Sequence, residues 1–497
     1  MLPPLGVPRE SNEEKRGESM KYAIVKGYVA GCRRLSFNLL NSKISPSPTL
    51  LSLFAMGRDV DGLAVKTILS HGTTLTAKAD AEADYQATKV LLEEGTSVIN
   101  QATFKINGSY IRVDSIDMAK KKLSEVKAGS KVKPDYVVDL AFQETQLRKV
   151  GIVNNQFSVI HRNPDFVTGD NWNGALLESD VTSQVNDLLE NENFNQFLRH
   201  FESNPDTVPE PTLTKNCKKC EFRHECWSGI ENPSIEIPNM SNKLVNKLVE
   251  LEAYSLESIP DEILTPKQLC FKNQIIGQEV RIAESDLLAD LQMLKFPAGH
   301  LDFEAFNLPY HPSPNIRTCA MVPFQASIHV EHSNGSIEHF EYLCDHEVDD
   351  RYSLAVFLVK NLSKVATVVA WNVSFERRML SHLAAEYRSL SEGLHEIIEK
   401  LVDLQPLVKN HVEHYLFRGS FGLKSVAPAL SPDFSYENLV VDNGNDANGS
   451  FQLMVRGMLP SNQILQTRNQ LLAYCKNDTA ATLAIHRALR KITEVEL

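Results

Sequence analysis

Two groups of side chains, far apart in the chain, could together hold metal ions. Asp302 and Glu304 lie two residues apart in an apolar stretch, so in a strand they would point to the same face of a sheet. Tyr474 comes about one helical turn before Asp478. Acids brought together in this way can bind two divalent metals about 3.5–4 Å apart, which clamp the attacking and leaving oxygens of a phosphodiester. The residue types therefore point to nuclease chemistry.

Three of the eight cysteines are crowded together at Cys217, Cys220 and Cys226. In a cytosolic protein that spacing indicates a metal site rather than a disulfide. Cys32, near the front of the first folded segment, is the best candidate for a fourth ligand and would join the two ends of a domain. Four thiolates suit both zinc and a [4Fe–4S] cluster, but one distant cysteine plus three close ones favours the iron–sulfur cluster. His224 is an alternative ligand.

A second set of chemically suggestive residues lies between these cysteines, in two runs at residues 110–118 and 123–127. Apolar and polar residues alternate in both runs and lysines fill the segment between them, which predicts a β-hairpin. Asp114, Glu125 and Lys127 would approach one another there, with Glu125 and Lys127 on one face. The two acids would bind a divalent metal, and the lysine would orient or activate a water.

A helix is expected shortly after Lys133, with Asp139 and Gln143 on one side. An acid, then Glu-x-Lys, then a helix with Gln, all framed by one early and three late cysteines, resembles the iron–sulfur members of the PD-(D/E)xK nuclease superfamily. These include CRISPR-associated adaptation nucleases and the nuclease domains of AddB-type recombination helicases. The resemblance covers roughly residues 21–227, and Gln101 stands where the family often carries a further acid or His. The residues that the resemblance makes catalytic are Asp114, Glu125, Lys127 and Gln143.

The C-terminal part alternates predicted strands and helices. Strands are expected at residues 300–306, 318–323, 324–331, 336–342 and 365–371, and a helix at residues 352–362. Three strands, a helix, a strand and further helices form an α/β pattern. This order resembles the RNase H-like fold of DnaQ-type exonucleases.

The motifs of DnaQ-type exonucleases occur here in the right order. Asp302 and Glu304 match the Asp-x-Glu of the first strand, and Tyr474 with Asp478 matches the final Tyr-x-x-x-Asp. The metal ligands that the resemblance implies are Asp302, Glu304, Glu376 and Asp478, which would hold two Mg²⁺ or Mn²⁺ ions. Tyr474 would orient a water that attacks the phosphodiester at a 3′ end.

Glu376 departs from the motif, because residues 372–376 read Asn-Val-Ser-Phe-Glu where the family has Asn-x-x-Phe-Asp. Asp403 is a rival supplier of the third acid. Family members carry an acid in a similar strand, but that acid is not usually a metal ligand. Glu376 is therefore the preferred assignment.

Length and composition are those of a soluble cytoplasmic protein with two or three domains. The sequence contains no apolar run long enough to span a membrane, and residues 1–20 are too polar for a secretory signal. The net charge of −12 argues against a protein that coats nucleic acid non-specifically, although the lysines within residues 120–133 could form a local patch.

Both halves together resemble a bacterial family of unknown function that fuses an iron–sulfur PD-(D/E)xK nuclease to a DnaQ-like exonuclease. The expected organisation is a disordered tail (1–19), a restriction-endonuclease-like domain with the iron–sulfur cluster (20–230), a helical connector (231–295) and an RNase H-like domain (296–497). Within the connector, helices are expected near residues 243–258 and 284–294.

The resemblance leaves two classes of function to compare. The preferred one is a metal-dependent nuclease that acts on single-stranded DNA or DNA ends, with RNA also possible, in DNA repair, CRISPR adaptation or phage defence. The alternative is a protein that binds nucleic acid or assembles complexes through decayed centres, which Gln101 and Glu376 support.

Overall fold

The computed structural model describes residues 12–42, 46–76, 80–169, 171–203, 207–311, 316–437, 439–441 and 443–493. The chain divides into two compact units. The first comprises Met1–Ser45, Leu53–Gly229 and Leu308–Ala320. The second comprises Pro46–Ser52, Ile230–Asn307 and Met321–Leu497. Each unit has its own sheet.

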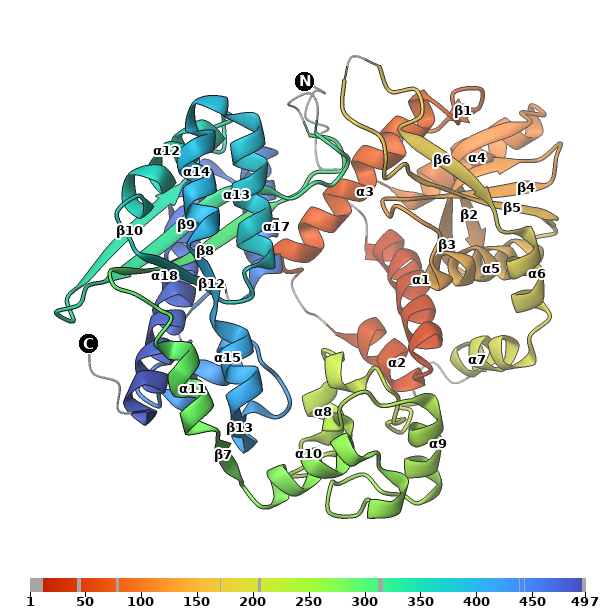
Figure 1. Cartoon of the computed structure of the whole chain (residues 1–497). Coiled ribbons are helices and arrows are strands. Elements are labelled where there is room, and N and C mark those ends of the chain that lie inside the picture. The colour runs from red at the N-terminus through yellow and green to blue at the C-terminus, as the bar shows by residue number, and fades with distance from the viewer. Residues whose placement is uncertain are drawn as a thin grey trace. The chain divides into compact units, whose positions relative to one another are not determined.

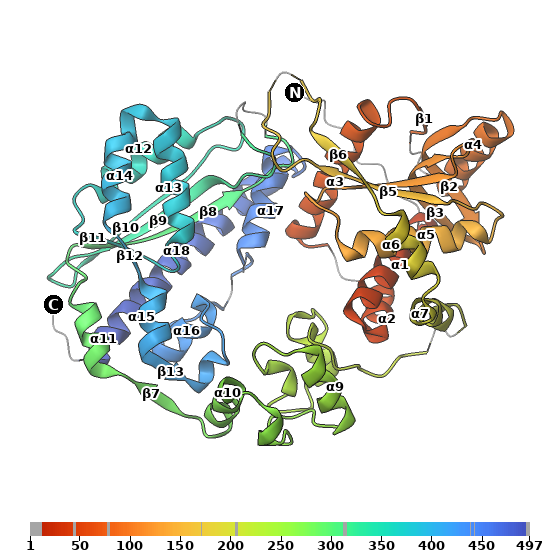
Figure 2. The ribbon, with the colours of Figure 1, turned by 45° about the vertical axis from the view of Figure 1, so that its right-hand side comes forward.

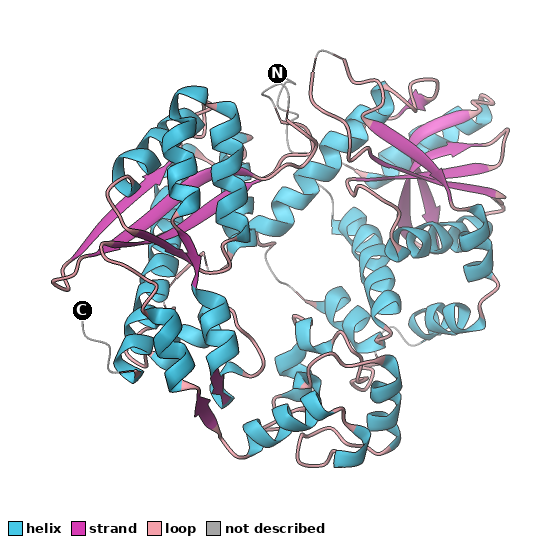
Figure 3. Cartoon of the chain, in the orientation of Figure 1, coloured by secondary structure: helices cyan, strands magenta, loops and turns pink. Residues whose placement is uncertain are grey.

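The first unit is built on a six-stranded sheet in which the strands lie side by side in chain order (Figures 1 and 3). Its strands are β1 (Thr73–Thr74), β2 (Val98–Ile106), β3 (Ser109–Asp117), β4 (Lys122–Lys127), β5 (Gln156–Arg162) and β6 (Leu176–Asp180). The β1–β2 and β4–β5 pairs are parallel, and the other three pairs are antiparallel. β3 and β4 form the predicted hairpin, in which Ser115 pairs with Ser124.

The first unit also contains helices. They are α1 (Asn12–Ala30), α2 (Arg33–Asn41), α3 (Pro48–Lys66), α4 (Ala81–Glu93), α5 (Pro134–Arg148), α6 (Thr182–Leu189), α7 (Glu192–Ser203) and α8 (Arg223–Trp227), with a 3₁₀ turn, η1, at Cys217–Lys219. Pro134 occupies the first turn of α5, where its missing N–H leaves no hydrogen bond unmade. Val113, Leu140 and Phe157 belong to the fully or almost fully buried core between α1, α5 and the sheet.

The segment that follows contains more regular structure than the sequence led us to expect. Its elements are η2 (Ser234–Glu236), α9 (Asn242–Glu250), η3 (Asp261–Ile263), α10 (Pro266–Ile276), β7 (Val280–Ile282) and α11 (Glu284–Leu291). The helix expected to reach residue 258 ends at Glu250, and α10 was not predicted. The sequence feature that marks the start of α10 is a capping box, formed by Thr265 and Gln268 on either side of Pro266. β7, which pairs with β13, is too short to show a period of two.

The second unit contains a five-stranded sheet of mixed direction. Its strands are β8 (Ala298–Phe306), β9 (Val322–Glu331), β10 (Ile337–Leu343), β11 (Thr367–Ala370) and β12 (Leu401–Asp403), in the order β10-β9-β8-β11-β12. β10, β9 and β8 are antiparallel, whereas β11 runs parallel to both β8 and β12. The strand expected at residues 318–323 is absent as a separate element in this described segment. The left-handed backbone of Cys319 (φ 52°) breaks an extended chain, and β9 begins only at Val322.

Helices cover both faces of this second sheet (Figures 1 and 2). They are α12 (Arg351–Leu362), α13 (Ser374–Glu386), α14 (Ser391–Glu399), α15 (Leu404–His411), α16 (Leu423–Leu430), α17 (Gly444–Val455) and α18 (Ser461–Ile492); β13 (Val412–His414), η4 (Arg388–Leu390) and η5 (Tyr415–Phe417) complete the unit. α12, α13 and α14 lie on one face, and the long α18 crosses the other, against β8 and β9. Val369 of β11 and Ala481 and Ile485 of α18 are fully buried in the core between this helix and the sheet.

The alternation of helices and strands confirms the α/β class in its coarse form. Residues 12–19, which we expected in a disordered tail, belong to α1 instead, since the Glu, Lys and Arg residues of this stretch favour a helix. Residues 1–11 of the expected tail lie outside the described residues. Among the helices that the structure describes, none has the length and apolarity to cross a membrane.

Candidate functional site

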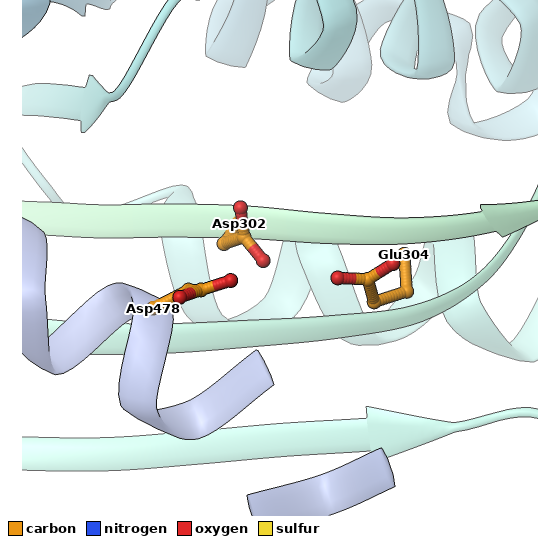
Figure 4. Close-up of side chains that lie close together, drawn as sticks. All are labelled: Asp302, Glu304 and Asp478. Carbon is orange, nitrogen blue, oxygen red and sulfur yellow. The ribbon is translucent and has the colours of Figure 1, made fainter. Parts of the chain in front are cut away.

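β8 and α18 bring three carboxylates of the second unit together (Figure 4). Asp302 and Glu304 are two residues apart in β8, and Asp478 projects from α18 toward them. One oxygen of each of the three carboxylates lies within 4.8 Å of the others. We call these three residues the carboxylate cluster. Asp302 and Glu304 come from the first motif predicted from the sequence, and Asp478 comes from the last one.

Burial and mutual repulsion shape the electrostatics of the carboxylate cluster. Burial, followed by the charges of Asp478 and Glu304, raises the pKa of Asp302 well above its usual value. Burial, followed by the charges of Asp478 and Glu376, raises the pKa of Glu304 in the same way. A divalent cation would compensate this repulsion, and carboxylate oxygens are the ligands that Mg²⁺ and Mn²⁺ prefer. The donor set therefore fits a hard divalent ion.

Glu376 lies close to the cluster as a fourth acid. It occupies the first turn of α13, directly after β11 and the turn at Asn372. Its side chain is buried, and its Oε2 atom has no hydrogen-bond partner among the described residues. Burial raises the pKa of Glu376 to about 8 and the charge of Asp403 adds to this, against a backbone hydrogen bond that lowers it. An unpartnered buried oxygen beside three acids is available as a ligand for a cation.

Asp403, the rival third acid, is hydrogen-bonded to the backbone through both of its oxygens. It ends β12 and caps α15, where its Oδ1 accepts the N–H of Gln405 at 3.1 Å. Oδ1 also accepts the N–H of Asn372 at 2.9 Å, and Oδ2 accepts the N–H of Val373 at 3.2 Å. Asn372 has a left-handed backbone (φ 66°). Asp403 thus holds the turn that leads into Glu376, and this geometry favours Glu376 as the third acid.

Two tyrosine hydroxyls meet Asp478. Tyr474, one turn earlier in α18, hydrogen-bonds to it, and the hydroxyl of Tyr436 donates to its Oδ1 at 2.9 Å. Burial, followed by the charge of Asp478, raises the pKa of both tyrosines, so both stay protonated donors. The Cys475 thiol donates to Oδ2 of Asp302 at 3.3 Å. We missed Tyr436 in the sequence because a tyrosine in a loop carries no pattern that links it to a distant helix.

The first unit holds a second constellation, formed by Glu125, Lys127 and Asp139, which we call the lysine centre. Lys127 Nζ lies 2.5 Å from Glu125 Oε1 and 2.6 Å from Asp139 Oδ2. Gln143 Nε2 donates to Glu125 Oε2 at 2.7 Å and to Asp139 Oδ1 at 2.8 Å. Burial, followed by the charges of neighbouring acids, raises the pKa of Glu125 to about 7. Burial opposes ionisation of Asp139, but the charge of Lys127 holds the pKa of that acid below its usual value.

Asp114 stands next to the lysine centre but is already hydrogen-bonded. Its Oδ2 accepts the N–H of Val126 at 2.7 Å, and its Oδ1 accepts Nε2 of Gln101 at 3.3 Å. Gln101 has a left-handed backbone (φ 60°) within β2 and lies between two paired residues of that strand. The structure therefore brings Asp114 and Glu125 together, with Gln101 as a partner of Asp114.

Two further charged residues lie beside the lysine centre and were not predicted from the sequence. Lys21 of α1 lies 3.6 Å from both Glu125 and Asp139. Burial opposes its charge, but those two acids raise the pKa of Lys21. For Asp61 of α3, burial, followed by the charges of Asp114 and Glu125, raises the pKa well above the usual value. Neither helix carries a pattern that could have placed these residues beside the hairpin.

The four cysteines expected to share one cofactor line a single cavity of the first unit, which we call the cysteine cavity. Cys32 precedes α2, and Cys217, Cys220 and Cys226 lie in and around η1 and α8. Burial is the main cause that raises the pKa of Cys220 and Cys226, and the neighbouring thiols add to it. His224, the alternative ligand, is not among the lining residues.

Four thiolates suit both cofactors considered, a zinc ion and a [4Fe–4S] cluster. A single zinc ion with Zn–S bonds of about 2.3 Å would hold its sulfurs about 3.8 Å apart. Among the described residues, no three cysteine sulfurs lie within 4.8 Å of one another. The backbone N–H of Thr214 donates to Cys217 Sγ at 3.2 Å, a contact that suits a thiolate ligand. The shared cysteine cavity therefore fits a cofactor that is held by four thiolates.

Comparison with known proteins reaches part of the second unit. Residues 299–422 match a family described as a domain of unknown function, DUF2779. This range includes Asp302, Glu304, Glu376 and Asp403, and it stops before Tyr436, Tyr474 and Asp478. Neither the curated proteins nor the solved structures gave a match.

Proposed function

We propose that this protein is a metal-dependent nuclease that hydrolyses phosphodiester bonds of DNA. The observation that carries the proposal is the carboxylate cluster, whose three acids lie within 4.8 Å with Glu376 beside them. Asp302, Glu304, Asp478 and Glu376 would hold Mg²⁺ or Mn²⁺. Bound there, the ions would lower the pKa of a coordinated water and stabilise negative charge on the phosphate.

The chain's own residues would orient this chemistry. Tyr474 and Tyr436 fix the Asp478 carboxylate by hydrogen bonds, and Tyr474 is the one placed to orient an attacking water. Asp403 fixes the turn before Glu376. The resemblance of the three motifs to DnaQ-type exonucleases supports attack at the 3′ end of single-stranded DNA. DNA repair, CRISPR adaptation and phage defence are settings that this activity would serve.

We propose the lysine centre as a second nuclease centre in the first unit. Glu125 and Asp114 would bind the divalent ion, and Lys127 would orient or activate a water. The ion pairs of Lys127 with Glu125 and Asp139 support this assignment, because they hold the ammonium group at the acids. Gln143, in α5, holds Glu125 and Asp139 in place by donating a hydrogen bond to each carboxylate.

We also propose that Cys32, Cys217, Cys220 and Cys226 hold a [4Fe–4S] cluster. The shared cysteine cavity supports this ligand set, and the sequence pattern of one distant and three close cysteines favours the iron–sulfur cluster. Cys32 lies near the beginning of the first unit and Cys217, Cys220 and Cys226 near the end of its main segment. The cofactor would therefore tie distant parts of the chain together and add to the stability of this unit.

A cleavage assay on the purified protein tests the proposal. Single-stranded DNA labelled at its 5′ end is incubated with Mn²⁺, and we expect a ladder of products shortened from the 3′ end. Asp302→Asn should abolish the ladder, whereas Asp286→Asn, on the exposed start of α11, should leave it unchanged. Duplex DNA and RNA run alongside define the substrate. Binding without cleavage under all metals would support the alternative of a nucleic-acid-binding protein.

A further inference from the structure

A groove of about 460 Å³ runs along the first half of α18 in the second unit. Amide side chains, among them Gln466, Asn469 and Gln470, line it from the helix. Leu439 and Val440 line it from the loop between α16 and α17. The volume falls within the range of about 300–1,000 Å³ that is typical of ligand pockets. We call this hollow the α18 groove.

Both walls of the α18 groove lead to the carboxylate cluster. Gln466, Gln470, Tyr474 and Asp478 follow one another at intervals of four, so they form one ridge on the helix surface. On the other wall, Leu439 and Val440 lie three and four residues after Tyr436, whose hydroxyl bonds Asp478. The helix and the loop that line the groove thus each also contribute a tyrosine that hydrogen-bonds to Asp478.

The chemistry of the α18 groove suits nucleobases. The described residues that line it carry no charged side chain, so they offer nothing to neutralise phosphates. Amide groups both donate and accept hydrogen bonds and can pair with base edges. Val440 and Leu465, whose side chains are 72% and 70% exposed, provide apolar surface against which bases can lie. A phosphate backbone would find no cationic partner among these described lining residues.

We infer that the α18 groove binds unpaired bases of a single nucleic-acid strand whose terminal phosphodiester lies at the carboxylate cluster. This inference rests on the proposed function and adds to it the part of the substrate that is recognised. The groove would read bases several nucleotides upstream of the bond that is cut. The enzyme would then need a strand longer than the two nucleotides at the scissile bond.

The first test measures binding of a fluorescein-labelled single-stranded oligonucleotide by anisotropy, with Ca²⁺ in place of Mg²⁺. The double variant Gln466→Ala/Gln470→Ala should raise the Kd at least about tenfold, since the amide groups that would pair with base edges are lost from both positions. Gln463→Ala is the matched control, because it removes an exposed amide of the same helix that does not line the groove. The double variant should raise the Kd by the same factor at low and at high salt, because the substitutions remove no contact between a cationic side chain and a phosphate.

The second test removes the bases instead of the side chains. An oligonucleotide with abasic residues upstream of its 3′-terminal nucleotide should bind the wild-type protein as weakly as the intact strand binds the double variant. The double variant should bind both strands alike, which is the coupling expected of direct partners. The inference would be overturned if the double substitution weakened binding of the intact and the abasic strand by the same factor, or if it left the Kd for the intact strand unchanged. Either result would point to a peptide as the occupant.

A small substrate separates this inference from the proposed function. The p-nitrophenyl ester of thymidine 5′-monophosphate presents a phosphodiester but no upstream bases. Wild type and double variant should hydrolyse it at the same rate, while only the variant loses activity on the oligonucleotide. If the ester is cleaved but groove variants act on strands like wild type, the inference fails and the nuclease stands. If neither substrate is cleaved although the groove still selects bases, the proposed function fails and the base-binding site stands.

Discussion

Asp403 accepts the backbone N–H of Asn372 at 2.9 Å and so fixes the left-handed turn that delivers Glu376 to the carboxylate cluster. Two acids that looked like rivals in the sequence thus have different tasks. The carboxylate of Asp403 accepts hydrogen bonds from three backbone N–H groups, whereas one buried oxygen of Glu376 has no hydrogen-bond partner among the described residues. The turn between β11 and α13 is where the structure distinguishes a supporting acid from a candidate ligand.

This division of labour predicts different effects of the two substitutions. Glu376→Asp should change the metal preference or the rate, because the shorter side chain moves the carboxylate away from the cluster. Asp403→Asn should lower the free energy of unfolding by about 1 kcal/mol, because the amide nitrogen that replaces Oδ2 cannot accept the N–H of Val373, and it should have less effect on metal affinity. Calorimetric titration with Mn²⁺ and thermal unfolding measure the two effects. An essential Asp403 beside a dispensable Glu376 would reverse the assignment.

Asp302→Asn should separate activity from stability. Removing one of the repelling acids should cost at least about 100-fold in turnover on labelled single-stranded DNA. The same change should raise the melting temperature of the metal-free protein, because a buried carboxylate with a raised pKa destabilises the folded state once ionised. Asp286→Asn serves as the exposed control for both measurements. A variant that loses activity and stability together would argue for a purely structural Asp302.

Glu376 should make the stability of the metal-free protein depend on pH. Its pKa rises from 4.5 to about 8 on folding, so the folded state binds the extra proton and stability falls as pH rises through that window. Buried histidines with lowered pKa oppose this trend below about pH 6.5, so the test belongs between about pH 6.5 and 8. Melting temperatures in EDTA should fall across this range, and Glu376→Gln or added Mn²⁺ should reduce the slope. An identical slope in Glu376→Gln would contradict the raised pKa.

Cys217→Ser should remove the iron–sulfur cluster. Anaerobically purified wild type should be brown and contain iron and acid-labile sulfide, and the variant should lose both. The first unit should then unfold at a lower temperature, because the cofactor stabilises only the folded ligand set. Cys270→Ser is the matched control, since this exposed cysteine lies in α10 outside the cysteine cavity. If the purified protein contained stoichiometric zinc and no iron, the four cysteines would form a zinc site and the proposed cluster would be wrong.

Lys127→Ala should silence the lysine centre without touching the iron content. The measurement is best made in an Asp302→Asn background, where any remaining cleavage comes from the first unit. Lys21→Ala should weaken the same activity, because Lys21 shares both acids with Lys127. Lys131→Ala, which removes an exposed lysine of the turn before α5, is the control. If cleavage persisted after Lys127→Ala in this background, the lysine centre would not be the second nuclease centre.

The sequence by itself determined the local elements that carry most of the candidate residues. Alternation of apolar and polar residues predicted the β3–β4 hairpin with Glu125 and Lys127 on one face, and the strand with Asp302 and Glu304. Spacing by four placed Tyr474 and Asp478 on one side of a helix. These features depend on the period of strands and helices, which is written in consecutive residues.

Only the tertiary structure decided which distant side chains complete each site. Lys21 and Asp61 reach the lysine centre from α1 and α3, and Tyr436 reaches Asp478 from a loop. Their neighbours in sequence carry no trace of these contacts, because the contacts arise when separate elements pack around a shared core. The roles of Asp403 and Glu376 were separated for the same reason: a backbone turn, invisible in the pattern of residue types, decides which carboxylate is occupied and which is left free.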